Sequence, residues 1–119
     1  MAKILIVDDS KTSRKILRAI LEENGHEIIA EAVNGADGLE KFKEVHPDLI
    51  TMDITMPVMD GLESLKKIRE HDNTAKIIMV TAAGQKTKMV DAIKFGACEF
   101  LAKPYDAMQI IDIIHKVLG

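Results

Sequence analysis

Five short apolar segments recur along the chain, each followed by a polar residue and then by a longer segment with helical periodicity. The short segments are rich in β-branched residues and carry apolar residues at successive positions, which is typical of strands buried on both faces of a sheet. An alternation of this kind predicts a parallel sheet with helices on both faces, and right-handed crossovers make it a doubly wound, three-layer α/β sandwich. The expected strands cover residues 4–7, 28–30, 48–53, 76–81 and 99–102.

The longer segments carry the signals of five helices, which are expected to begin near residues 10, 35, 61, 85 and 106. Ser10 is suited to cap the first helix, and Asp106 opens a capping box with Gln109 before the last one. Apolar residues at helical spacing form the core-facing stripes. These stripes are expected to include Ile16 in the first helix and Ile93 in the fourth.

The length of 119 residues indicates one domain, expected to span residues 1–119. Because 47% of the residues are hydrophobic, the chain is expected to fold. The formal net charge is -3 with both signs mixed, which gives no reason to expect nucleic acid or an anionic membrane as a partner. No stretch approaches the length of a membrane span. The chain has a single cysteine, Cys98, which suits a reducing cytoplasm. Cys98 is expected in the core, whereas His26 and the other histidines are expected in turns or at the surface.

Acidic, hydroxyl and ammonium side chains stand at the ends of the expected strands. Asp8 and Asp9 follow the first strand, and Asp53 ends the third. Thr81 ends the fourth strand, and Lys103 follows the fifth. The carboxyl ends of parallel strands lie at one edge of the sheet, where α/β proteins bind their ligands. We therefore expect these five residues to converge, although each alone is also explained as a turn, capping or surface residue.

The residue types at this edge fit phosphoryl chemistry. Carboxylates that lie close together repel one another, so a cation is expected to hold them. Lysine is one such cation, and Mg²⁺, which binds through a few carboxylates and keeps several waters, is the other. Asp53 is suited to be the nucleophile, and Lys103 and the metal to neutralise charge on the transferred group. The Thr81 hydroxyl is suited to donate to a phosphoryl oxygen.

Four motifs carry a resemblance to a known family, and it covers the whole chain. The motifs are Asp8-Asp9, the segment MDITMP at 52–57 with Asp60-Gly61, Thr81-Ala82 and Lys103-Pro104. With them the chain resembles response-regulator receiver domains of the stand-alone chemotaxis type. The resemblance implies a flavodoxin-like (βα)5 fold with strand order 2-1-3-4-5, an order that pattern alone does not give, and a cis Lys103-Pro104 bond.

The resemblance also implies roles for the residues at the sheet edge. Asp53 is expected to accept a phosphoryl group from a phosphohistidine on a sensor kinase or from a small acyl phosphate. Asp9, Asp53 and the main-chain carbonyl of Thr55 are expected to ligate Mg²⁺, with Asp8 reaching the metal through water and Mn²⁺ as a substitute. Lys103 is expected to contact the phosphoryl group.

Signalling is expected to depend on a second group of residues. Thr81 would swing toward the phosphoryl group, and Phe100 occupies the family's switch-aromatic position, where it lacks the hydroxyl of the more usual tyrosine. Thr55 and Ala83 lie beside the expected site and are placed to tune the phosphoryl lifetime. Added negative charge would bias a two-state surface formed by the fourth helix, the fifth strand and the fifth helix. Four apolar residues there are interpreted first as partial core and second as a partner-binding face: Val90, Phe95, Met108 and Ile113.

A receiver of this type is a signalling switch rather than an enzyme, although it assists its own phosphorylation and dephosphorylation. The expected partners are a histidine kinase and a downstream protein, such as a flagellar motor switch protein in chemotaxis. A single-domain phosphorelay shuttle that passes its phosphoryl group to a phosphotransferase is the alternative. The protein is expected to be a cytoplasmic monomer.

Other classes of protein fit less well. A phosphatase of the haloacid-dehalogenase type also forms an aspartyl phosphate, but it needs a second aspartate where this chain has Thr55. A flavin carrier on the same architecture needs a hydroxyl-rich loop and flanking aromatic residues, which make up only 3% of this chain. The nucleoside triphosphatase motif G-x-x-x-x-G-K-[ST] does not occur. A receiver that binds its partner without phosphorylation is a further alternative.

Overall fold

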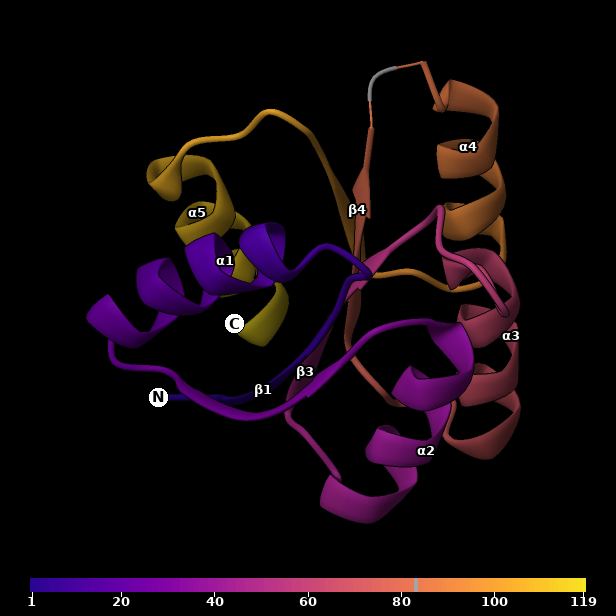
Figure 1. Ribbon diagram of the computed structural model, residues 1–119, viewed down its shortest axis with the longest axis horizontal. Helices are drawn as coiled ribbons and strands as arrows, with labels where there is room; N and C mark the ends of the chain where they lie inside the picture. The colour runs from indigo at the N-terminus through magenta and orange to yellow at the C-terminus, as the bar shows by residue number, and fades with distance from the viewer. Residues whose placement is uncertain (83) are drawn as a thin grey trace.

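A parallel sheet of five strands lies between two layers of helices in the computed structural model, with α1 and α5 on one face and α2, α3 and α4 on the other (Figure 1). The structure describes residues 1–82 and 84–119, with the main chain alone at residue 86, so Ala83 lies outside the described residues. The strands are β1 (Lys3–Val7), β2 (Glu27–Ala32), β3 (Leu49–Asp53), β4 (Ile77–Thr81) and β5 (Glu99–Ala102). The helices are α1 (Lys11–Glu23), α2 (Gly35–Val45), α3 (Gly61–His71), α4 (Lys86–Lys94) and α5 (Ala107–Leu118).

The strand order is β2-β1-β3-β4-β5, and every pairing is parallel, which confirms the doubly wound fold and the order that the resemblance implied. Strand β2 is longer than its apolar run because it pairs with β1 as far as Val7 opposite Ala32. It lies at an edge of the sheet, where polar residues such as Glu31 are accommodated. The apolar run alone therefore underestimates the length of this strand.

The strands are buried on both faces, as their unbroken apolar runs predict. In β1, Leu5 and Val7 face the layer of α2, α3 and α4, whereas Ile4 and Ile6 face α1 and α5. All four side chains are at most 1% exposed. Burial of a side chain of this size stabilises the fold by about 1.5–3 kcal/mol, so the two apolar clusters hold the sheet and its strand ends firmly in register.

Four of the five helices begin with a side chain that accepts a hydrogen bond from the main-chain N–H three residues later. These capping residues are Ser10, Asn34, Asp60 and Asp106, and the last one forms the expected capping box. Helix α4 differs, because the side chain at its N-cap, Gln85, makes no capping hydrogen bond. A capping hydrogen bond stabilises a helix by about 1 kcal/mol, so α4 begins with less local support than the others.

Four predictions about burial are wrong. Ile16 and Ile93 are 56% and 45% exposed, because each lies at the margin of its helical stripe and the sheet covers only the centre. Cys98 is exposed, because Ala97 fills the core at the entry to β5 while the Cys98 N–H pairs with the main chain of β4. His26 is only 9% exposed, because it packs under the N-terminal segment, where its Nδ1 accepts a hydrogen bond from the Ala2 N–H at 3.1 Å.

Among the described residues, no helix combines the length and the apolar character that crossing a bilayer requires.

Candidate functional site

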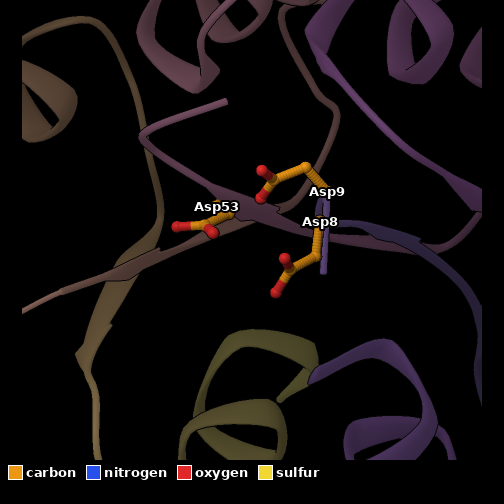
Figure 2. Close-up of side chains that lie close together, drawn as sticks. All are labelled: Asp8, Asp9 and Asp53. Atoms are coloured by element: carbon orange, nitrogen blue, oxygen red, sulfur yellow. The ribbon is translucent and has the colours of Figure 1, made fainter. Parts of the chain in front are cut away.

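Three carboxylates meet at the carboxyl edge of the sheet. Asp53 is the last residue of β3, and Asp8 and Asp9 follow β1, which pairs directly with β3. Oxygens of the three side chains lie within 4.8 Å of one another. Figure 2 shows the three side chains grouped at the ends of these neighbouring strands. The predicted convergence of the strand-end acids is therefore found in the structure.

Lys103 supplies the counter-charge to this cluster. Its Nζ lies 3.3 Å from Asp8 Oδ2 and 3.4 Å from Asp53 Oδ2. The bond from Lys103 to Pro104 is cis, as expected, and the Lys103 N–H donates to the Thr81 carbonyl at 2.7 Å. Partial burial lowers the pKa of Lys103, but the charges of Asp53 and Asp8 outweigh that effect and raise it overall. Lys103 is therefore firmly cationic.

One ammonium does not fully neutralise the cluster. Burial raises the pKa of Asp53, the Asp8 charge raises it further, and the attraction of Lys103 only partly offsets both, so the net shift is upward. Asp53 is 9% exposed, so its charge is poorly solvated. A second cation that prefers hard oxygen ligands fits this environment, because the Lys103 ammonium pairs with only two of the three clustered carboxylates.

The two adjacent aspartates are held differently. Asp8 Oδ1 accepts a hydrogen bond from the Ser10 N–H at 2.8 Å, and its Oδ2 faces Lys103, so both oxygens are engaged. The Asp9 carboxylate is exposed and has no hydrogen-bond partner in residues 1–82 and 84–119. Asp9 is thus free to bind an ion directly, whereas Asp8 is already oriented by protein groups.

The loop after Asp53 is shaped by a very close main-chain approach. A Cβ at Gly61 would lie 2.0 Å from the Asp53 carbonyl oxygen, so only glycine fits there. The Gly61 N–H donates to the Ile54 carbonyl at 2.7 Å, and buried Ile54 and Met56 anchor the loop in the core. This packing leaves Thr55, between the two anchors, exposed at the rim.

Thr81 and Phe100 do not join the acids in this structure. Thr81 is fully buried, and its hydroxyl donates to the Met89 thioether on α4 at 3.2 Å. Phe100 is half-buried against the same apolar cluster as α4 and lies opposite Met79 in the strand pairing. Of the expected partner-face residues, Phe95 and Ile113 pack partly against the core, whereas Val90 and Met108 are 67% and 72% exposed.

Two residues that sequence reasoning missed support this site. The Arg14 guanidinium pairs with Glu31 at 2.9 Å and donates to the Asp8 carbonyl at 2.7 Å, so it joins β2 to the acid cluster. The Gln85 side chain bonds to both Thr55 and the main chain of Ala82. A basic or amide residue at the start of an amphipathic helix is usually solvated, so nothing in the pattern distinguishes these two.

An apolar cleft of about 400 Å³ opens beside Lys103. It lies between α1 and the segment after β5, and the exposed Ile16 forms part of its wall. The lining residues are Ser13, Ile16, Ile20, Ala82, Lys103, Pro104 and Tyr105.

Comparisons with known proteins agree with this geometry. The family model of the response regulator receiver domain matches residues 4–115. Chemotaxis protein CheY of Bacillus subtilis (strain 168) is 50% identical over 117 residues, which are 98% of each chain. Chemotaxis protein CheY of Thermotoga maritima is 43% identical over 115 residues, 97% of this chain and 96% of the relative. A chain in the crystal structure of the CheX-CheY-BeF3-Mg+2 complex from Borrelia burgdorferi superposes with a TM-score of 0.94 at 36% identity, covering 98% of this chain and 89% of that one.

Proposed function

Because the chain belongs to the response regulator receiver domain family, we propose that it is a phosphoacceptor signalling protein whose acceptor is Asp53. The observation that carries this assignment is the meeting of Asp8, Asp9 and Asp53 at one edge of the sheet, with the Lys103 ammonium paired to Asp8 and Asp53. In the proposed reaction an Asp53 oxygen attacks the phosphorus of a phosphohistidine and a P–O bond forms. The P–N bond breaks, and the imidazole leaves with the bonding electrons and takes up a proton.

The protein groups at the site divide this work. Lys103, whose pKa is raised although burial alone would lower it, faces the charge that is carried by the transferred group. Asp53 is held at the end of a fully buried strand, so its attacking oxygen has a fixed position. An ionised carboxylate needs no general base, which is consistent with a cluster of three carboxylates and a lysine among the described residues.

A Mg²⁺ ion fits the donor set, with Asp9 and Asp53 as direct carboxylate ligands and Asp8 acting through water. The main-chain carbonyl of Thr55 completes the proposed set, and among the described residues it accepts no hydrogen bond. The asymmetry between Asp8, with both oxygens engaged, and Asp9, with neither, supports this division. When bound, the ion neutralises negative charge on the acceptor and on the incoming phosphoryl group.

Signal output is proposed to pass through Thr81 and Phe100 to the face of α4, β5 and α5. A phosphoryl group adds about 1.5–2 negative charges beside Lys103. A stronger acceptor than the Met89 thioether then becomes available to the Thr81 hydroxyl, and the space that it leaves admits the Phe100 ring. Val90 and Met108 on this face are exposed enough to contact a partner.

We infer that the protein acts in the cytoplasmic chemotaxis pathway, where a histidine kinase phosphorylates it and a flagellar motor switch protein binds the phosphorylated form. The names of several relatives, CheY of Bacillus subtilis among them, support this pathway. The apolar cleft beside Lys103 is the docking place that we propose for the kinase segment that carries the phosphohistidine. A switch of this kind carries its phosphoryl group for a time and is not a turnover catalyst for exogenous esters.

Mass spectrometry after treatment with acetyl phosphate tests the proposal. With Mg²⁺, a single phosphoryl adduct is expected on the peptide that contains Asp53, and excess chelator should abolish it. The matched control is Asp60→Asn, which changes a helix-capping aspartate in the same segment and should leave labelling intact. Labelling at another residue, or steady turnover of a generic phosphate ester, would contradict the assignment. Rapid transfer onward to a histidine phosphotransferase would favour the phosphorelay shuttle over chemotaxis.

A further inference from the structure

The side chain of Gln85 spans two loops at the rim of the site. Its Oε1 accepts a hydrogen bond from the Ala82 N–H at 3.0 Å, and its Nε2 donates to the hydroxyl of Thr55. Thr55 lies two residues after Asp53, and Ala82 directly follows the end of β4. Since Asp53 and Val80 are paired across β3 and β4, these loops flank the acceptor on neighbouring strands. One amide group therefore joins the two loops beside Asp53.

The bridge has a consequence for α4. Gln85 occupies the N-cap of this helix, but its side chain makes no capping bond because both of its polar atoms are engaged in the loops. The first turn of α4 contains no acidic residue that would compensate. The four other helices all have capping side chains. Gln85 thus stabilises the rim of the site instead of the helix that it begins.

We propose that Gln85 is a positioning residue that prolongs the lifetime of the phosphoryl group on Asp53. The inference rests on the proposed function, because it concerns hydrolysis of the same aspartyl phosphate. In that reaction a water oxygen bonds to phosphorus, the bond from phosphorus to the Asp53 oxygen breaks, and the carboxylate leaves as an anion. The two protons of the water end on phosphate and solvent.

The physical basis is control over the path of the water. Because one side chain bonds to both Thr55 and Ala82, these two residues are held together beside the acceptor. Without the bridge the exposed Thr55 hydroxyl and the Ala82 N–H bind water instead, which brings solvent to the rim. A single neutral hydrogen bond supports an effect of about three- to tenfold on the hydrolysis rate.

A double-mutant cycle between Gln85→Ala and Thr55→Val tests this. Each protein is labelled with acetyl phosphate and Mg²⁺, the donor is removed, and loss of the phosphoryl group is followed by phosphate-affinity electrophoresis. Each single variant should lose the group about three- to tenfold faster than the wild type. The double variant should be no faster than the faster single variant, because both changes remove the same bond. Thr87→Ala, at an exposed position of α4, is the matched control and should behave as the wild type.

Two results overturn the inference while leaving the proposed function intact. One is a labelled Gln85→Ala protein whose phosphoryl lifetime equals or exceeds that of the wild type. The other is a double variant whose acceleration equals the product of the two single effects. Melting temperatures within about 2 °C of the wild type are expected for both single variants, since each changes a rim contact. Failure of the wild type itself to label at Asp53 overturns the proposed function and the inference together.

Discussion

The Thr81 hydroxyl donates to the sulfur of Met89 across 3.2 Å and so joins the end of β4 to α4. Thr81 is fully buried, so its hydroxyl is isolated from water. A thioether is a weak acceptor, and a charged oxygen is a much stronger one. The contact holds the hydroxyl on the α4 side of the sheet, and under the proposed function a phosphoryl oxygen beside Asp53 would be the stronger acceptor that draws it away.

Replacement of Met89 by leucine should favour the activated arrangement. Met89→Leu conserves volume but leaves the buried Thr81 hydroxyl without an acceptor, which destabilises the resting state by about 1 kcal/mol. In the presence of Mg²⁺, the affinity for beryllofluoride, a phosphoryl mimic, should rise about three- to fivefold, as measured by NMR titration. In a Thr81→Ala background the same substitution should have no such effect. An unchanged or weaker affinity for Met89→Leu alone would contradict this role of the contact.

Arg14 is predicted to affect magnesium binding through the Asp8 main chain. Arg14→Lys keeps the charge, but an ammonium cannot serve Glu31 and the Asp8 carbonyl with the fixed fork of the guanidinium. The dissociation constant for Mg²⁺ should rise about threefold by calorimetry, with a loss of about 1 kcal/mol in stability. Arg18→Lys is the control, because Arg18 also pairs with Glu31 but does not contact Asp8. Equal effects of the two variants would assign the loss to the Glu31 pairing alone.

Asp53→Asn should stabilise the metal-free protein. Burial raises the pKa of Asp53 above its unfolded value, and the Asp8 charge adds to the shift. The stabilisation that the protonated carboxyl gives to the folded state is therefore fully present below the pKa of the unfolded chain. It is lost as the pH rises through the higher pKa of the folded state, so the ionised carboxylate destabilises the fold at neutral pH. In chelator at pH 7 the variant should melt about 3 °C higher than the wild type. Addition of Mg²⁺ should reduce this difference in melting temperature. A lower melting temperature would show that the Lys103 attraction outweighs burial.

His26 should make the fold sensitive to mild acid. Burial lowers its pKa, and the charges of the N-terminal amino group and His115 lower it further. Stability linked to a lowered histidine pKa is complete above the unfolded value of about 6.5 and is lost as the pH falls toward the folded value. Protonation also turns Nδ1 into a donor that faces the Ala2 N–H.

Urea unfolding at pH 7.5 and pH 5.5 measures this loss. His26→Gln offers an oxygen that can accept from the Ala2 N–H without titrating, so it should lose less stability between the two pH values than the wild type. His71→Gln, at an exposed position of α3, should lose as much as the wild type. A wild-type protein that is equally stable at both pH values would rule out His26 as the source.

The sequence predicts those parts of the site that depend on strand ends, and it fails where long side chains cross between elements. Asp53 and Lys103 could be placed together because parallel strands end at one edge, whatever the details of packing. The contacts of Arg14 and Gln85 depend on side-chain conformations and loop positions that no periodicity encodes. Ile16 follows the apolar stripe of α1 yet stands on the wall of a cleft. The strand order came from family resemblance, because pattern alone does not distinguish between right-handed arrangements of five strands.

Gly61, whose main chain lies against the Asp53 carbonyl, limits the substitutions that this site can accept. Any side chain at position 61 would collide with the carbonyl of Asp53, so a saturation library at that position should return glycine alone among proteins that still take up phosphate. Val58, three residues earlier, is 85% exposed and adopts a φ of 68°, so glycine or asparagine should be accepted there and should even strengthen the fold. On the proposed assignment of Asp53, changes that tune the phosphoryl lifetime are therefore expected at rim positions such as Thr55 and Gln85 and not at Gly61.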